Sequence, residues 1–222
     1  MSLRRPQMVL FDLDGTLVDT LPDLARCIDM TLQAVGMPPR GEDRVRRWIG
    51  SGIDTLLKCA LMDDHDREPD VSLYQRAWRI FMDIYAENSC VQSRLYPGVT
   101  ETLAYLRNNR FKLGCITNKP GQFTGPLLKT LGIYDDFGIV VAGDTLPRKK
   151  PDPLPLLHAA GFFSVKPEHA LMVGDSDNDV NAARAAGLQV LGVSYGYNHG
   201  RDISDSGPDG IIDTLTELQQ LI

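Results

Sequence analysis

The sequence lacks any apolar run close to the roughly 20 residues that a membrane-spanning helix needs. It also lacks the apolar leader pattern of a secretory signal near residue 1. Positive charge is not in excess, since 23 Lys and Arg stand against 29 Asp and Glu for a net charge of -6. Nucleic acids and anionic membrane surfaces attract clustered positive charge. We therefore expect a cytoplasmic protein that has neither as its main partner.

The sequence also lacks cysteine motifs. The four cysteines show no CxxC pair and no spacing typical of zinc ligands. Cys27, Cys59 and Cys115 stand inside apolar patterns, where a buried thiol is the usual arrangement. With 222 residues, 43% of them hydrophobic, the chain is long enough for a large core, alone or with a second, smaller domain.

Helical spacing dominates residues 21–90. Apolar residues recur every three or four positions from Leu21 to Val35 and again from Tyr74 to Tyr85, which is typical of amphipathic helices. Gly36 is placed to end the first of them. Almost no strand-like segment interrupts this region, so it is expected to be an all-helical insertion.

The rest of the chain alternates between short apolar strands and helices, which predicts a parallel sheet covered by helices on both faces. Strands are expected at residues 8–12, 112–117, 139–142, 169–173 and 189–193, and helices at residues 99–108, 122–131, 153–160 and 178–186. The predicted fold is therefore a doubly wound α/β core, residues 1–20 and 91–222, that carries an inserted helical domain, residues 21–90.

Polar residues follow the strands, where open parallel sheets bind their ligands. In chain order they are Asp12 and Asp14 beside a Gly15-Thr16 turn, then Thr117 and Asn118, then Lys150, then Asp175 and Asp179. Clustered carboxylates repel one another unless a cation neutralises them. A hard divalent ion with oxygen ligands, Mg²⁺ above all, fits this requirement.

This set of side chains suits phosphoryl transfer. Asp12 stands at a strand tip and is the candidate nucleophile, whose attack would form an aspartyl-phosphate. Asp14 can protonate the leaving oxygen and later deprotonate water. Lys150 and Mg²⁺ can neutralise the phosphoryl oxygens, and Thr117 with the backbone beside Asn118 can donate hydrogen bonds to them.

Four motifs resemble, in order and spacing, those of the haloacid dehalogenase superfamily. They are Asp-Leu-Asp-Gly-Thr from Asp12, Thr-Asn-Lys from Thr117, Lys150-Pro151, and Gly-Asp-Ser-x-Asn-Asp from Gly174. The resemblance implies that Asp12 is the nucleophile and Asp14 the acid/base. It places Mg²⁺ on the Asp12 carboxylate, the Asp14 backbone carbonyl and Asp175, with Asp179 in support, and it implies a helical cap inserted after the first motif.

Within the superfamily, the chain resembles the bacterial phosphoglycolate phosphatases. The resemblance rests on Tyr-Gly-Tyr-Asn-x-Gly at residues 195–200, Trp-Ile-Gly-Ser-Gly at residues 48–52, and an expected helix over residues 212–218. It implies a small phosphorylated metabolite as partner, with 2-phosphoglycolate as the lead substrate. Both a monomer and a homodimer are compatible with the sequence.

Other functions stay open on the sequence alone. A sugar-phosphate phosphatase or a phosphomutase would share the Asp12 chemistry, and an inactive metabolite-binding or regulatory protein could share the fold. True dehalogenation is disfavoured, because Asp14 offers acid/base chemistry that halide displacement does not need.

Several residues near the motifs have a less certain place in the pattern. In the helical insertion, Arg47 and Gly50-Ser51-Gly52 are candidates for contact with the substrate, although they also fit an ordinary helix–turn boundary. Lys119 is expected to face solvent or the edge of the site, because lysines are seldom buried. His199 is a candidate for the rim, and Asp177 has no assigned role.

Overall fold

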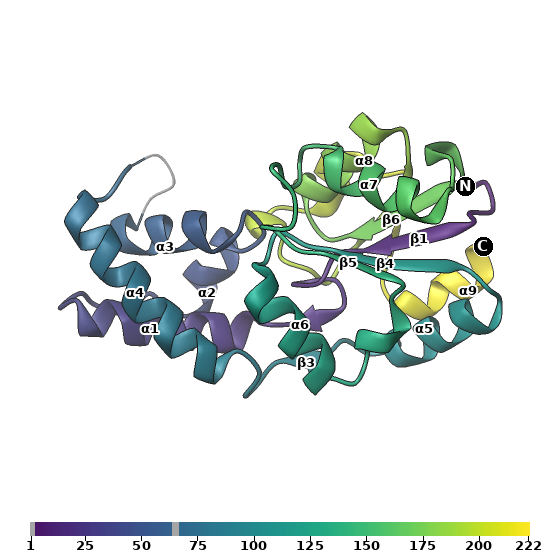
Figure 1. The fold of residues 1–222 in the computed structure, drawn as a ribbon. Helices are drawn as coiled ribbons and strands as arrows, with labels where there is room; N and C mark the ends of the chain where they lie inside the picture. The colour runs from purple at the N-terminus through teal and green to yellow at the C-terminus, as the bar shows by residue number, and fades with distance from the viewer. Residues whose placement is uncertain (1–2, 64–66) are drawn as a thin grey trace.

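A six-stranded parallel sheet forms the centre of the fold in the computed structural model, which describes residues 3–63 and 67–222 (Figure 1). In spatial order its strands are β5 (Ile139–Val141), β4 (Lys112–Ile116), β1 (Met8–Phe11), β6 (Ala170–Gly174), β7 (Gln189–Val193) and β8 (Gly210–Ile212). Met8 lies opposite Lys112 on one side and Ala170 on the other. The central position of β1 therefore brings the residues after β1, β4 and β6 to one edge.

Helices cover both faces of this sheet. They are α5 (Val99–Asn108), α6 (Gly121–Thr130), α7 (Leu154–Phe163), α8 (Asp177–Ala186) and α9 (Leu218–Leu221), with short 3₁₀ helices η2 (Tyr134–Asp136), η3 (Pro167–His169), η4 (Asn198–Gly200), η5 (Ile203–Ser206) and η6 (Leu215–Glu217). Val9 and Phe11 pack into one apolar cluster, whereas Met8 and Leu10 pack into another. Alternate residues of a strand point to opposite faces, so β1 is buried on both.

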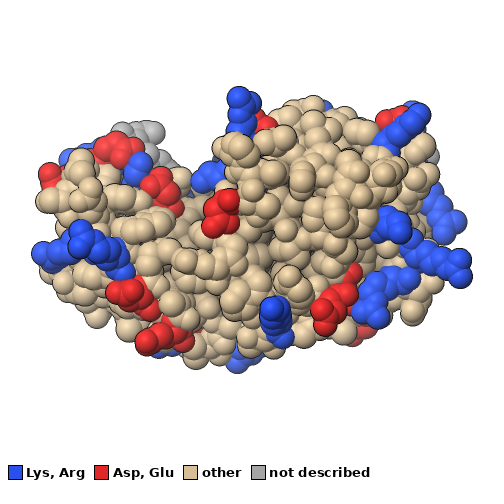
Figure 2. Space-filling model, in the orientation of Figure 1, with Lys and Arg blue, Asp and Glu red and all other residues tan. Residues whose placement is uncertain are grey.

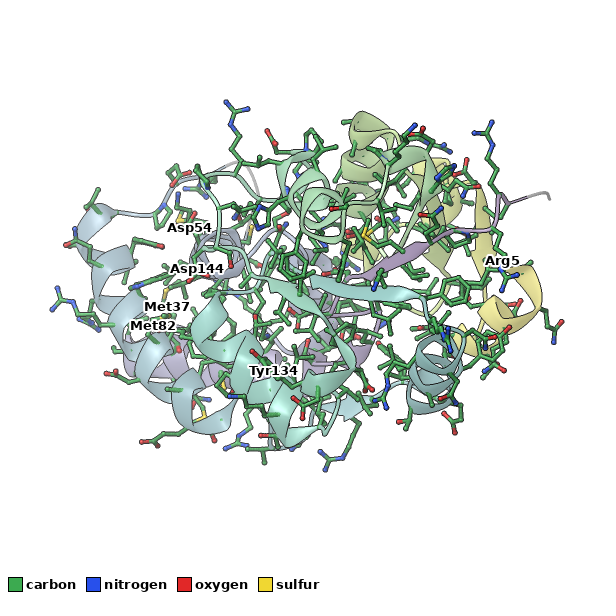
Figure 3. All side chains as sticks on the ribbon, turned by 45° about the vertical axis from the view of Figure 1, so that its right-hand side comes forward. Arg5, Met37, Asp54, Met82, Tyr134 and Asp144 are labelled. Atoms are coloured by element: carbon green, nitrogen blue, oxygen red, sulfur yellow. The ribbon has the colours of Figure 1, made fainter. Side chains whose placement is uncertain are left out.

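A helical insertion, here called the cap, lies beside one end of the sheet (Figure 1). It contains α1 (Leu21–Ala34), α2 (Glu42–Val45), η1 (Arg46–Trp48), α3 (Ile53–Met62) and α4 (Val71–Asn88). Its buried side chains form an apolar cluster that Phe123 and Tyr197 of the core join. Met37 and Met82 pack against this cluster, as Figure 3 shows.

Two short strands, β2 (Val18–Asp19) and β3 (Arg94–Leu95), pair where the chain leaves the core and returns to it. The buried carboxylate of Asp23, in the first turn of α1, accepts hydrogen bonds from the backbone N–H groups of residues 91–93, at 2.8 Å from Ser93. Asp23 therefore fastens the returning segment to the beginning of the cap.

Most expected elements are present, with ends shifted by a residue or two. The thiols of Cys27, Cys59 and Cys115 are buried, as predicted. The helix expected over residues 212–218 is wrong at its start, because Ile212 ends β8 and helical structure begins only at Leu215. Three residues are too few to show a strand's alternating pattern, so β8 was not foreseen. None of the described helices is long and apolar enough to cross a membrane.

Candidate active site

Three buried carboxylates meet at the carboxyl edge of the sheet. One oxygen each from Asp12, Asp175 and Asp179 lies within 4.8 Å of the other two. Asp12 directly follows β1, Asp175 directly follows β6, and Asp179 stands in the first turn of α8. Neighbouring parallel strands that end at one level therefore assemble the cluster predicted from the sequence.

Lys150 is the counter-charge within this cluster. Its ammonium nitrogen lies 2.8 Å from Asp12 Oδ1 and 2.6 Å from Asp179 Oδ1, and it donates a hydrogen bond to the Ile116 carbonyl. Burial alone would lower the pKa of Lys150, but the Asp12 and Asp179 carboxylates raise it above its ordinary value. Lys150 is therefore a permanent positive charge beside Asp12.

Hydrogen bonds hold the other two carboxylates in place. Thr16 donates its hydroxyl to Asp175 Oδ1, and the Tyr197 backbone N–H donates to Asp175 Oδ2. Asp179 Oδ2 accepts from both the backbone N–H and the hydroxyl of Ser176 in a capping box. The orientation of the carboxylates therefore comes from the loops that carry them.

The charge of the cluster fits a bound divalent cation. Burial raises the pKa of Asp12 well above its ordinary value, even though Lys150 opposes the shift. Burial also raises the pKa of Asp175 to about 7, and the neighbouring Asp179 adds to this. Asp12 is buried, and Lys150 at 2.8 Å from its Oδ1 is one positive charge beside three carboxylates. A cation among these oxygens would relieve the repulsion that remains between them.

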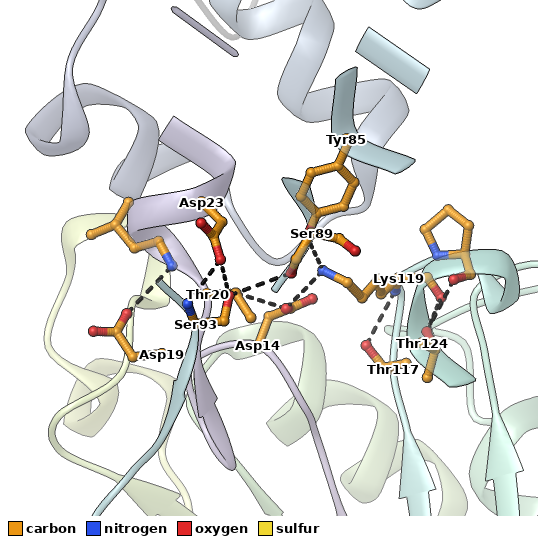
Figure 4. Close-up of polar contacts among 12 residues, drawn as sticks. Asp14, Asp19, Thr20, Asp23, Tyr85, Ser89, Ser93, Thr117, Lys119 and Thr124 are labelled. Atoms are coloured by element: carbon orange, nitrogen blue, oxygen red, sulfur yellow. Dashed lines mark hydrogen bonds and ion pairs between the residues drawn. The ribbon is translucent and has the colours of Figure 1, made fainter. Parts of the chain in front are cut away.

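Asp14 lies next to this cluster and is held by two groups. Its Oδ1 accepts a hydrogen bond from the Thr20 hydroxyl at 2.7 Å and an ion-paired hydrogen bond from Lys119 Nζ at 3.0 Å. Lys119 Nζ also donates to the Tyr85 hydroxyl at 2.6 Å, and Tyr85 belongs to α4 of the cap. Figure 4 shows Lys119 between Asp14 and Tyr85.

A pocket opens between the core and the cap above these residues. The core lines it with Asp12, Asp14, Thr117, Asn118 and Lys119, and the cap lines it with Leu24, Ile49, Gly50, Gly52, Ile53 and Leu56. Asn118 links the two parts, since its Nδ2 donates to the carbonyls of Gly50 and Lys150. The surface is hollowed between cap and core, and charges of both signs are scattered over the face seen in Figure 2. Cap and core thus enclose the space in front of Asp12.

Comparison with known proteins agrees with this site. The family model for haloacid dehalogenase-like hydrolases matches residues 9–193. A protein named phosphoglycolate phosphatase from Nitrosococcus oceani is 54% identical over 220 residues, which are 99% of this chain and 98% of the relative. The chain belongs to the haloacid dehalogenase-like hydrolase family.

Two further relatives match this hydrolase over nearly the whole length of both chains. A phosphoglycolate phosphatase from Nitrosospira multiformis is 48% identical, over 96% of this chain and 94% of the relative. The crystal structure of a predicted phosphoglycolate phosphatase from Haemophilus somnus superposes with a TM-score of 0.92, at 38% identity and 99% coverage of both chains. The six-stranded sheet and helical cap are therefore the fold of this family.

One expectation about the hydrolase is wrong. Lys119 was expected to face solvent or the edge of the site, yet its side chain is only 2% exposed and lines the pocket. Burial alone would lower its pKa, but the neighbouring Asp14 and Tyr85 raise it. The Tyr85 partner lies 34 residues away in the cap. No local pattern around Lys119 could have indicated this contact.

The predicted cap residues divide into two groups. Gly50 and Gly52 line the pocket, but Arg47 is exposed and packs against Gly200 outside it. Ser51 lies at the outer rim, where its hydroxyl accepts a long hydrogen bond of 3.4 Å from Asn178. The structure therefore does not bring Arg47 to the pocket.

The rim also holds His199, which the sequence placed there as a candidate, and Asp177, which had no assigned role. Asp177 pairs with Arg201 at 2.5 Å and lies 3.6 Å from His199, whose ring contacts the backbone carbonyl of Arg47 in the cap. These side chains join core and cap at the rim, and none of them lines the pocket in front of Asp12.

The loop after β7 contributes a residue that the sequence reasoning did not single out by role. Tyr197 holds Asp175 through its backbone, and its hydroxyl donates to Asp19 at 2.7 Å while accepting from the backbone N–H groups of Thr20 and Leu21. One residue thus joins the acidic cluster to the first cap linker. The Tyr-Gly-Tyr-Asn motif was the signal that could have indicated such a role.

Proposed function

We propose that this hydrolase is a magnesium-dependent phosphatase that converts 2-phosphoglycolate to glycolate and phosphate. The observation that carries the proposal is the buried Asp12 carboxylate, which faces the pocket with Lys150 at 2.8 Å and Asp14 two residues away. The substrate follows from the relatives, whose printed name is phosphoglycolate phosphatase.

The reaction divides into two steps at Asp12. One Asp12 carboxylate oxygen attacks phosphorus, the ester P–O bond breaks, and Asp14 donates a proton to the departing oxygen. Water then attacks the phosphorus of the aspartyl-phosphate, Asp14 takes the proton from that water, and the Asp12 carboxylate is regenerated. Lys150 balances the phosphoryl charge, while Thr117 and the backbone at Asn118 orient the phosphate.

Mg²⁺ is the proposed cofactor. The Asp12 carboxylate, the Asp14 backbone carbonyl and Asp175 would hold it, with Asp179 fixing Lys150 beside them. When bound, Mg²⁺ would supply charge neutralisation at the phosphoryl oxygens and restrain the phosphate. The cap turn at Gly50, Ser51 and Gly52 would cover a small substrate and reduce its contact with water.

We also propose the domain boundaries that the sequence predicts. Residues 1–20 and 91–222 would form the core and residues 21–90 the cap. The separate apolar cluster of the cap and the β2–β3 pair at its base support this division. The proposed partner of the protein is a small phosphorylated metabolite, and we propose neither a nucleic acid nor a membrane surface as a further partner.

A phosphate-release panel tests the substrate. We expect Mg²⁺-dependent release from 2-phosphoglycolate with kcat/KM at least about tenfold above that for glucose 6-phosphate or other sugar phosphates, because the pocket encloses little space around Asp12. Chelation with EDTA should abolish release and added Mg²⁺ should restore it. Equal kcat/KM across the panel would overturn the assignment of 2-phosphoglycolate.

Metal binding should also change the pH dependence of stability. The pKa of Asp175 is raised from 3.8 to about 7 in the metal-free fold. The folded state therefore holds this proton more tightly than the unfolded state, so the contribution of Asp175 favours folding at low pH and is lost as the pH rises from about 4 to about 7. Mg²⁺ needs the ionised carboxylates, so it should raise the melting temperature more at about pH 8 than at about pH 5.

Melting curves with Mg²⁺ and with EDTA at both pH values measure this difference directly. Asp175→Asn is the matched variant, since it removes the charge but keeps the shape of the side chain. It should lose most of the Mg²⁺-dependent rise at the higher pH. A rise of the same size at both pH values would contradict the proposed metal site.

A further inference from the structure

The pocket in front of Asp12 is lined by a single positive charge among the described residues. Among the described residues that line it, Lys119 is the only lysine or arginine. The cap contributes apolar side chains and two glycines to the same pocket. Arg47 and Lys149 are exposed and do not line it, and Lys149 donates to the Ser51 carbonyl on the outer side of the cap turn. A negatively charged group on the non-phosphate end of a substrate would therefore meet Lys119.

The contacts of Lys119 leave it able to bind such a group. Its ammonium group carries three N–H donors. Two of them are directed at Asp14 Oδ1, at 3.0 Å, and at the Tyr85 hydroxyl, at 2.6 Å. The third donor has no partner among the described residues, and the side chain lines the pocket.

The spacing matches a 2-phosphoglycolate-like substrate. In that molecule the carboxyl carbon is two bonds from the ester oxygen, which is the atom that Asp14 must reach to protonate it. Lys119 Nζ is in direct contact with Asp14. A substrate whose ester oxygen lies against Asp14 can thus bring its carboxylate within reach of Lys119.

We propose that Lys119 is the specificity-determining residue that binds the carboxylate of the substrate, and that Tyr85 is a positioning residue that holds the ammonium group over the pocket. The inference rests on the proposed function, because it names the residue that separates 2-phosphoglycolate from neutral phosphate esters. Tyr85 is buried between Phe81 and Phe123, with ring centroids at 5.2 and 4.8 Å, so its hydroxyl is firmly placed. Tyr85 also makes the recognition depend on the cap, since α4 carries it.

The test compares 2-phosphoglycolate with ethyl phosphate, which has the same chain length and no carboxylate. For each protein the measured quantity is the ratio of the two kcat/KM values. The ratio cancels any loss of Asp14 function, because both substrates need Asp14. Lys119→Met should lower the ratio by about tenfold to a hundredfold, as expected for loss of a charged hydrogen bond. Tyr85→Phe keeps the ring and should lower the same ratio by a smaller factor.

The matched control is Lys129→Met at the exposed end of α6. This variant should have the same ratio as the wild-type protein. If Lys119→Met lowered both kcat/KM values by one factor and kept the ratio, the proposal would be overturned and Lys119 would act on Asp14 alone. An unchanged ratio in Tyr85→Phe would overturn the role of Tyr85. The proposed function has its own test, because it fails if the wild-type kcat/KM does not favour 2-phosphoglycolate.

Discussion

Replacing Asp12 by Asn should lower kcat for phosphate release by about 10⁴-fold or more, because the amide cannot act as the nucleophile. The change keeps the size of the side chain in a site where Asp12 is only 6% exposed. It removes one negative charge from the cluster with Asp175 and Asp179, so the metal-free fold should be as stable as the wild type or more stable.

Two measurements separate this outcome from simple unfolding. Phosphate release with saturating Mg²⁺ reports the chemistry, and a melting curve in EDTA reports the fold. Asp177→Asn serves as the control, since Asp177 lies at the rim in a pair with Arg201. It should keep near wild-type turnover. Substantial turnover by a folded Asp12→Asn protein would refute the assignment of Asp12 as nucleophile.

Replacing Asp14 by Asn should lower kcat for 2-phosphoglycolate by about 10²- to 10⁴-fold, the usual contribution of a general acid/base. The amide can still accept hydrogen bonds from Thr20 and Lys119, so the local structure should persist. Both steps need the Asp14 proton transfer, so both should slow.

A substrate with a better leaving group separates the two steps. p-Nitrophenolate departs without a proton, so Asp14→Asn should release about one equivalent of p-nitrophenol rapidly from p-nitrophenyl phosphate. Slow turnover should follow, because hydrolysis of the aspartyl-phosphate still needs a base. Rapid-mixing absorbance measures the burst. A variant that turns over 2-phosphoglycolate at the wild-type rate would remove Asp14 from acid/base chemistry.

The sequence was informative wherever a single segment carries its own signal. The Met8–Phe11 strand is apolar throughout, and Asp12 and Asp175 stand directly after strand ends. Parallel strands share one carboxyl edge, so the meeting of Asp12, Asp175 and Asp179 could be predicted without coordinates. The β2–β3 pair could not, because two-residue strands form only when distant segments are brought together.

The features that could not be predicted from the sequence depend on contacts between distant segments. Lys119 was expected near solvent because lysine usually lies there, and its burial depends on Asp14 and on Tyr85 of a separate helix. Arg47 carries the charge expected of an anion-binding residue, but the turn of η1 directs it away from the pocket. Composition and spacing report which residues are available, whereas packing decides which way they face.

The central position of β1 also has a consequence for the order in which the chain folds. Met8 pairs with Lys112 and Ala170, so neither edge of β1 can be completed until the cap and β4 have left the ribosome. The cap helices pack mainly against one another within residues 21–88, so they can assemble during that interval. We expect the apolar β1 segment to wait with unpaired backbone edges, a state that favours aggregation. The slow step of folding should therefore be closure of the sheet around β1 rather than assembly of the cap.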